Sequence, residues 1–249
     1  MLYSQRISAG ILRLDFAGNN IRLGHVNIEQ PVIALITDTT GLMNLTWYLD
    51  MLKTPDDTVK KGETRFSVNR ITIQDGRFDL LNRTRQPGKS LIDFNNLRLS
   101  GINGEAEDFR IRSDSTILEI NDIRFMESSG FLVRSMNSNL TLAGKDILFR
   151  DLFLYLDSSI INANHVIISG DETDGFGNFT EKVRLNISLD KSLISAPDLR
   201  YFLPAAGGLK ESVELSGRIT GTVSDMNGRK ITAAYRDFTR LECDFDMSG

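Results

Sequence analysis

The stretch "IEQPVIALITDTTGLMNLTWYLDML", residues 28–52, decides the fold prediction because its periodicity changes part-way along. Its first part alternates apolar and polar residues like a β-strand, and a Thr-Gly turn follows. From Asn44, a residue type favoured at helix N-termini, one apolar stripe has helical spacing, formed by Leu45, Tyr48, Leu49 and Leu52. The stretch therefore predicts a strand, a turn and a helix over 44–53 that ends before Pro55, and nothing in it indicates catalysis.

Period-two alternation also dominates the rest of the chain, in segments that short Asn, Asp, Gly and Ser clusters separate. Examples are "NIRLGHVNIEQ" (20–30), "RFSVNRITIQDGRFDLL" (65–81) and "EKVRLNISLD" (181–190). A second, shorter helix is predicted in "SAPDLRYFL" (195–203), with Ser195 as its cap and Pro197 in its first turn. The sequence thus predicts a mainly β chain with one or two short helices.

An internal repeat links the opening stretch to a later one. "HVNIEQPVIAL" (25–35) aligns without a gap with "RITIQDGRFDL" (70–80), so that apolar positions coincide. The matched pairs are Val26 with Ile71, Ile28 with Ile73, Ile33 with Phe78, and Leu35 with Leu80. A two-residue turn at Asp75-Gly76 would place the second set on one face of a hairpin. Since one such unit cannot bury its own apolar face, the repeat predicts units stacked into an extended sheet or a solenoid.

Composition limits the functional classes. The chain has 249 residues, of which 41% are hydrophobic and 25% charged, so an ordered chain is expected. Its net charge of -4 and pI of about 5.3 give no electrostatic footprint for nucleic acid. The single cysteine, Cys243, excludes an intrachain disulfide. The apolar run 31–36 is too short to span a bilayer, and "MLYSQRISAG" (1–10) lacks a signal-peptide core. We therefore expect a cytoplasmic chain or a piece of a longer protein.

Two polar stretches are candidates for ligand sites. "QPGKS" (86–90) is similar to the end of a P-loop, but Arg83 stands where the motif needs its first glycine. "GDETDGFGNF" (170–179) offers Asp171, Asp174 and Asn178 as calcium ligands, although their spacing does not match an EF-hand. A turn and a solvated strand connection are the favoured interpretations.

The remaining reactive side chains do not form a known catalytic pattern. His25 and His165 lie beside strands with no cysteine or carboxylate cluster at metal-binding spacing, so structural roles are predicted. Cys243 stands between two acidic residues, which do not favour a thiolate. The sequence predicts no enzyme activity, no metal site and no cofactor.

Several motifs resemble the AsmA-like superfamily. "LGHVNIEQPVIALITDTTGLMNLTWYLDML" (23–52) is similar to its signature of a strand, a proline-led strand, a D-x-x-G-x-x-N-L turn and a short helix. The matching residues are Val26, Ile28, Pro31, Leu35, Asp38, Gly41, Asn44, Leu45 and Leu49. Residues 151–168 and 196–231 resemble the TamB branch, the latter through Asp198, Phe202, Pro204, Gly217 and Gly221.

The resemblance implies one continuous groove segment over residues 1–249. It would comprise the AsmA-like motif over 11–55, β repeats over 64–190 and TamB-like strands over 196–249. The implied fold is an elongated, curved antiparallel sheet of stacked repeats that forms a U-shaped β-groove (a "β-taco") with an apolar interior. The implied location is the periplasm, within a longer protein whose inner-membrane anchor is absent from this chain.

The implied function is non-enzymatic. The groove would carry phospholipids between inner and outer membrane, or assist outer-membrane protein assembly with a TamA-type barrel partner. Its expected partners are phospholipid acyl chains and that barrel, and no nucleic acid. The alternative is a structural solenoid or sandwich with a dry core, serving as a scaffold or adhesin.

The predicted groove lining consists of apolar residues that alternate along the expected strands. They are Val26, Ile28, Ile33, Leu35, Ile71, Ile73, Phe78, Leu80, Phe94, Leu97, Leu99, Ile123, Phe125, Leu154, Leu156, Val183, Leu185 and Ile187. Trp47 and Met51 lie off the apolar stripe of the first helix and are predicted to meet a membrane surface or a partner.

Overall fold

The computed structural model describes residues 2–15, 20–40, 44, 65–84, 91–111, 115–171, 179–202, 207–208, 210–236 and 239–248. In this part of the chain, fourteen strands form one sheet, accompanied by the short helices α2 (Phe179–Lys182) and α3 (Ala196–Leu199). The strands are β1 (Leu2–Tyr3), β2 (Arg6–Asp15), β3 (Asn20–Glu29), β4 (Val32–Thr37), β5 (Arg65–Asn82), β6 (Asn96–Ile111), β7 (Ser115–Glu127), β8 (Leu132–Ala143), β9 (Asp146–Leu156), β10 (Ile160–Ser169), β11 (Arg184–Ser195), β12 (Ser212–Gly221), β13 (Asp225–Tyr235) and β14 (Thr239–Ser248). The prediction of a mainly β chain with little helix is confirmed.

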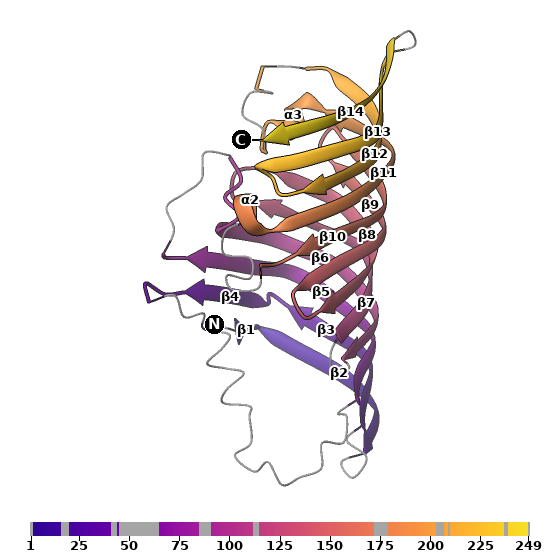
Figure 1. Cartoon of the computed structure of the whole chain (residues 1–249). Coiled ribbons are helices and arrows are strands. Elements are labelled where there is room, and N and C mark those ends of the chain that lie inside the picture. The colour runs from indigo at the N-terminus through magenta and orange to yellow at the C-terminus, as the bar shows by residue number, and fades with distance from the viewer. Residues whose placement is uncertain are drawn as a thin grey trace.

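The sheet is open and strongly curved. Strands β5 to β14 follow one another as an antiparallel meander, each hydrogen-bonded to its neighbour in sequence. Within the described residues β14 pairs only with β13, while β1 and β2 lie at the opposite edge. Figure 1 shows that the strands bend to the same side, so that the sheet curves around an inner face, which opens towards the left of the view. The predicted open, curved and mostly antiparallel sheet is therefore confirmed.

One exception to the antiparallel order lies at the repeat. Strands β3 and β4 both pair parallel with β5, β3 along its first half and β4 along its second. In these ladders Val26 stands opposite Ile71 and Ile33 opposite Phe78, the same pairs as in the sequence alignment. The two copies of the repeat thus lie side by side as parallel strands, in the register of the sequence alignment, and the predicted hairpin pairs of Ile73 with Phe78 and Ile71 with Leu80 do not form.

The predicted hairpin turn at Asp75-Gly76 is wrong. Strand β5 continues through these residues, and its register with β6 shifts there, so they form a β-bulge. A type I′ turn and a bulge both accommodate positive φ, and Asp75 has a φ of 52°, so the local sequence fits either structure. The extra residue shifts the alternation, and Ile73 and Phe78 therefore still share one face.

Bulges with positive φ recur across the sheet, and polar side chains of the next strand support them. The supporting bonds run from the Asp75 N–H to Asn103 Oδ1 (3.0 Å), from the Asp122 N–H to Asn137 Oδ1 (2.9 Å), and from the Lys230 N–H to Asp244 Oδ1 (2.7 Å). Each of the three donor residues has a φ close to 50°. Because a bulge bends its strand, these repeated bulges account for the curvature of the sheet.

The second predicted helix is present as α3. It follows Ser195 and has Pro197 in its first turn, as expected. The Ser195 side chain makes no capping hydrogen bond, however. Instead, the Ser195 N–H donates to Ser159 Oγ at 2.9 Å, which attaches the start of the helix to the connection between β9 and β10.

The first predicted helix, over 44–53, lies outside the described residues apart from Asn44, which is helical. The Asn44 side chain pairs with strand β4, because its Oδ1 accepts from the Ile36 N–H (3.0 Å) and its Nδ2 donates to the Ala34 carbonyl (2.8 Å). The Asn44 amide thus makes the two hydrogen bonds to β4 that the backbone of a neighbouring strand would make. Trp47 and Met51 lie outside the described residues.

Candidate functional site

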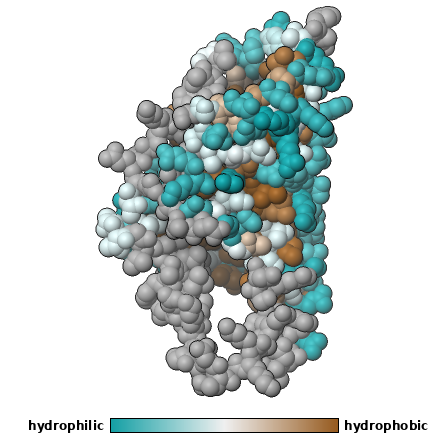
Figure 2. Space-filling view, viewed as in Figure 1, coloured by the Kyte–Doolittle hydropathy of each residue, from teal (hydrophilic) through white to brown (hydrophobic). Residues whose placement is uncertain are grey.

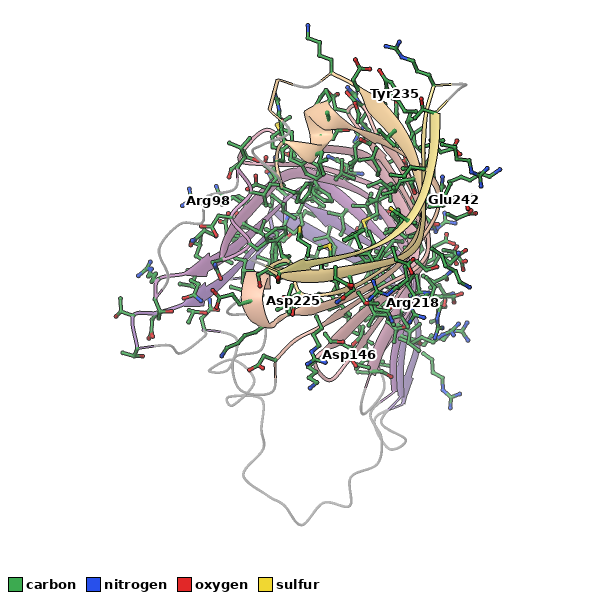
Figure 3. All side chains as sticks on the ribbon, turned by 45° about the horizontal axis from the view of Figure 1, so that its top comes forward. Arg98, Asp146, Arg218, Asp225, Tyr235 and Glu242 are labelled. Carbon is green, nitrogen blue, oxygen red and sulfur yellow. The ribbon has the colours of Figure 1, made fainter. Side chains whose placement is uncertain are left out.

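The two faces of the sheet differ in polarity. Figure 2 shows hydrophobic side chains gathered in the hollow of the sheet and hydrophilic ones around them. In Figure 3 the labelled side chains of Arg218 and Glu242 project from the outer side. The face that lines the hollow is called the concave face below. It is the candidate site, because none of the described residues forms a second layer over it, and an uncovered apolar face is uncommon in a monomer.

Its central feature is an unbroken line of apolar positions that crosses strands β7 to β14, one residue from each strand. In register order these residues are Leu118, Leu140, Phe149, Val166, Ile187, Ile219, Gly228 and Phe245. We call this set the apolar row. A parallel line, from Leu142 through Ile147, Ile168, Leu185, Gly221 and Met226 to Met247, runs beside it. Side chains of both lines lack hydrogen-bond donors.

The apolar row is only half-buried, apart from its buried glycine. Among the described residues fourteen apolar side chains are buried, including Leu152 (7% exposed) and the predicted lining residue Leu156 (3%), but no side chain of the apolar row is among them. Exposure increases towards the free edges, where Ile7 and Ile11 in β2 and Leu241 in β14 are more than half exposed. The concave face therefore resembles the wall of an open groove more than a sealed interior.

Most predicted lining residues lie in strands and follow the apolar alternation. Val26, Ile28, Ile33 and Leu35 stand opposite their repeat partners Ile71, Ile73, Phe78 and Leu80, and Leu99 and Leu97 stand opposite the last two. Ile123 and Phe125 lie in β7, Leu154 and Leu156 in β9, and Leu185 and Ile187 in β11. The sequence prediction missed six side chains of the apolar row, although the same alternation could have identified them: Leu118, Leu140, Phe149, Val166, Ile219 and Phe245.

Two predicted lining residues are not on strands. Phe94 lies in the connection before β6, and Val183 lies between α2 and β11. Val183 has no exposed surface, so it cannot contact a ligand directly. The assignment of both to a strand face is wrong, because an apolar residue in a connection can have the same spacing as the last residue of a strand.

Phe94 belongs instead to an aromatic cluster that the sequence prediction missed. Its ring stacks on that of Phe179 in α2, with centroids 4.4 Å apart and planes 13° apart. Phe202 lies 6.2 Å from Phe94, and Phe131 contacts both Phe202 (5.3 Å) and Tyr201 (5.4 Å). These five rings are called the aromatic bridge. No local pattern could have identified it, because its members come from four separate connections.

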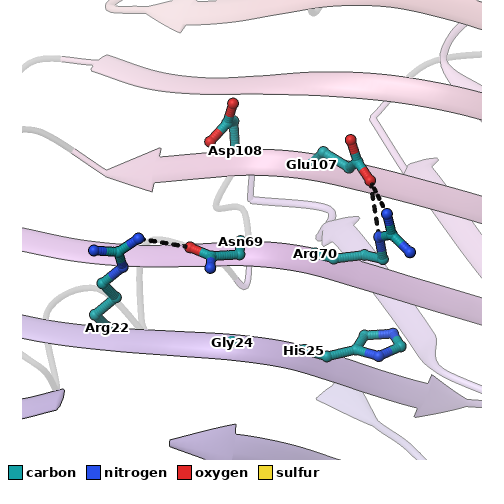
Figure 4. A pocket seen from close by; sticks show the side chains of 7 residues that line it. All are labelled: Arg22, Gly24, His25, Asn69, Arg70, Glu107 and Asp108. Carbon is teal, nitrogen blue, oxygen red and sulfur yellow. Dashed lines mark hydrogen bonds and ion pairs between the residues drawn. The ribbon is translucent and has the colours of Figure 1, made fainter. Parts of the chain in front are cut away.

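A polar pocket on the outer face does not form a second candidate site. It lies over β3, β5 and β6 (Figure 4), where Arg22 donates to Asn69 Oδ1 and Arg70 pairs with Glu107 at 2.6 Å. His25 Nε2 lies 2.8 Å from Thr72 Oγ1 of the next strand. These contacts connect neighbouring strands and indicate a structural role for the pocket.

Two groups outside the apolar row, Glu127 and Tyr235, have shifted pKa values. Burial raises the pKa of Glu127, but hydrogen bonds from Ser129, Ser128 and the Arg98 N–H outweigh it, so the pKa lies below its ordinary value. The Glu211 carboxylate accepts a hydrogen bond from the Tyr235 hydroxyl, which raises the pKa of Tyr235. Both groups lie at strand ends, Glu127 at the end of β7 and Tyr235 at the end of β13 (Figure 3 labels Tyr235), and neither belongs to the apolar row.

The described residues offer neither a metal site nor a membrane-spanning helix. Among them, no group of three or more His, Cys, Asp or Glu side chains is placed to hold a metal ion. No helix in the described part of the chain has the length and hydropathy to cross a bilayer. His165, like His25, contacts the neighbouring strand, with Nε2 3.4 Å from Asn186 Oδ1. Of the three residues considered for calcium, only Asp171 is described. All of "QPGKS" (86–90) lies outside the described residues.

Comparisons with protein-family models, with curated proteins and with solved structures find no match for this chain. The resemblance to the AsmA-like superfamily therefore stays a prediction from the sequence motifs.

Proposed function

We propose that the concave face binds phospholipid acyl chains and lets them slide along the apolar row. The protein would then be a segment of a conduit between the inner and outer membranes of a bacterial envelope. The observation that carries the proposal is the half-buried apolar row on an open sheet, over whose described strands no second layer lies.

Physical chemistry supports an acyl chain as the occupant. Moving each CH₂ group from water into an apolar site is favourable by roughly 0.8 kcal/mol, so the chain would be held strongly. A line of Leu, Phe, Val and Ile side chains offers no polar group that would fix one position. Neighbouring positions are therefore similar in energy, and the chain can move between them.

The wider setting follows from the resemblance alone. It places the groove in the periplasm, within a longer protein anchored in the inner membrane. A TamA-type barrel partner, and a role in outer-membrane protein assembly that uses the same face, belong to the same proposal.

Lipid extraction tests the proposal directly. Purified protein is extracted with organic solvent and the extract analysed by mass spectrometry, and binding of a fluorescent fatty acid is titrated in parallel. We expect co-purified phospholipid and saturable binding. If neither is found, the groove proposal is wrong and the structural scaffold is favoured.

Two phenylalanines of strand β9 give a matched pair of variants. Phe149 belongs to the apolar row, whereas Phe153 lies beyond a bulge at Asp151 (φ 50°), which reverses the alternation and turns Phe153 to the outer face, where it is 37% exposed. We expect Phe149→Asp to weaken fatty-acid binding at least about tenfold, because a charge beside an acyl chain is costly to desolvate. Phe153→Asp should bind as the wild type does, and circular dichroism checks that both variants fold.

The same two variants also distinguish an open groove from a dry core. If the apolar row were sealed core, Phe149→Asp would unfold the protein, since an unpaired buried charge costs several kcal/mol. Unfolding of Phe149→Asp with an intact Phe153→Asp would therefore contradict the proposal.

A further inference from the structure

The aromatic bridge crosses the open side of the sheet. Phe94 precedes β6 at one end of the strands, because Asn96 there pairs with Leu81 at the end of β5. Phe179 lies in α2, which follows β10 at the opposite end, where Ser169 pairs with Arg184. Their stacked rings, 4.4 Å apart, therefore join the two rims of the hollow. Figure 1 shows α2 on the open side of the sheet.

Hydrogen bonds stabilise the rim that carries Phe94, which Phe179 contacts from the opposite rim. The Tyr201 hydroxyl donates to the Gly130 carbonyl (3.2 Å), and the Ile92 N–H donates to the Tyr201 carbonyl (3.2 Å). Three connections, the one before β6, the one between β7 and β8 and the one after α3, thus meet at one point. Phe94, Phe131, Tyr201 and Phe202 thus form a fixed base on this rim, and among the described residues Phe179 is the ring that reaches it from the opposite rim.

The helix behind this base is also anchored. Asp198 of α3 is only 5% exposed, and its Oδ2 accepts from the Ser158 N–H at 2.9 Å. Ser159, 1% exposed, accepts from the Ser195 N–H through its Oγ. Because α3 is bound to the β9–β10 connection in this way, Tyr201 and Phe202 follow from a fixed position.

We propose that the aromatic bridge holds the two rims together and retains the hydrophobic ligand of the concave face. This inference rests on the proposed function. While the bridge is closed, an acyl chain lying on the middle strands cannot leave sideways through the open side and moves along the groove. Aromatic stacking suits this role, because the rings present an apolar surface to the ligand and leave no polar group unpaired.

A distance measurement tests the mechanical part without any ligand. Arg98 and Arg184 are exposed and lie near the two ends of the bridge, and both are changed to Cys for spin labelling. Cys243→Ser removes the native thiol. We expect Phe179→Ala to lengthen or broaden the distance distribution between the labels, whereas Phe153→Ala on the outer face leaves it unchanged.

Ligand release tests the functional part. Protein loaded with a fluorescent fatty acid is mixed with phosphatidylcholine vesicles, and transfer to the vesicles is followed in time. We expect release at least about threefold faster from Phe179→Ala than from the wild type or Phe153→Ala, with an unchanged amount bound at saturation.

The outcomes are separable. An unchanged distance distribution in Phe179→Ala shows that the bridge does not hold the rims, and overturns the inference. A wider distribution with unchanged release overturns retention alone. If the wild type binds no fatty acid, the proposed function fails and retention fails with it, while the distance measurement still decides whether the bridge joins the rims.

Discussion

Gly228 shows how one residue positions the last strand. It lies against the ring of Phe245, and a Cβ atom at this position would overlap with Phe245 Cε1. We expect Gly228→Ala to displace that ring and lower the free energy of unfolding by about 1–3 kcal/mol, the usual range for overpacking. Urea denaturation measures the change.

Gly10→Ala is the control for this substitution. Gly10 also lies in a strand, but a Cβ atom there would be 3.9 Å from its nearest neighbour, the His25 carbonyl oxygen, and the backbone needs no positive φ. This variant should be as stable as the wild type or slightly more stable. Equal stability of the two variants would show that Phe245 has room to move.

A substitution of Asn137 tests whether side-chain hydrogen bonds stabilise the bulges. Its Oδ1 accepts from the N–H of Asp122, whose φ of 50° bends strand β7. We expect Asn137→Ala to destabilise the protein by about 1 kcal/mol, because the donor loses its protein partner. Asn139→Ala, at an exposed position of the same strand as Asn137, should have little effect in the same urea titration. A smaller loss for Asn137→Ala than for Asn139→Ala would contradict this role.

At the scale of elements, the turn after β7 is predicted to be sensitive to acid. Glu127 is 3% exposed and accepts from the Ser129 N–H (2.7 Å) and Ser128 Oγ (2.8 Å). Its folded pKa lies below the ordinary 4.5, so the carboxylate stabilises the fold above about pH 4.5 and loses this effect as the pH falls through the folded pKa.

The corresponding experiment compares Glu127→Gln with the wild type by urea denaturation between pH 7 and pH 3. We expect the variant to be less stable at pH 7 and the difference to shrink on acidification. A difference independent of pH would mean that Glu127 acts through packing or neutral hydrogen bonds.

The strands themselves could be predicted because each exposes one face, which forces alternation on the sequence. The register of β3 and β4 against β5 matches the alignment of the two repeat copies, in which Val26 and Ile71 occupy the same place. The pairing of the copies with each other was not predicted, because Asp75-Gly76 satisfies a hairpin turn and a bulge equally.

For the whole molecule, the apolar alternation predicted a one-sided sheet but not what covers it. Phe94 and Phe179 meet only after the sheet has curved, so their contact depends on geometry that no single segment encodes. Half-burial of the apolar row likewise results from the absence of a second layer over the described strands, which only the complete arrangement reveals.

The parallel placement of β3 and β4 beside β5 also bears on the order in which the chain folds. Most neighbouring strands from β5 to β14 are joined by short connections, so their pairing closes small loops. His25 and Thr72, by contrast, meet across 47 positions of sequence. Loop-closure entropy therefore favours the meander as the earlier structure, with β5 as the template onto which the first strands are added last.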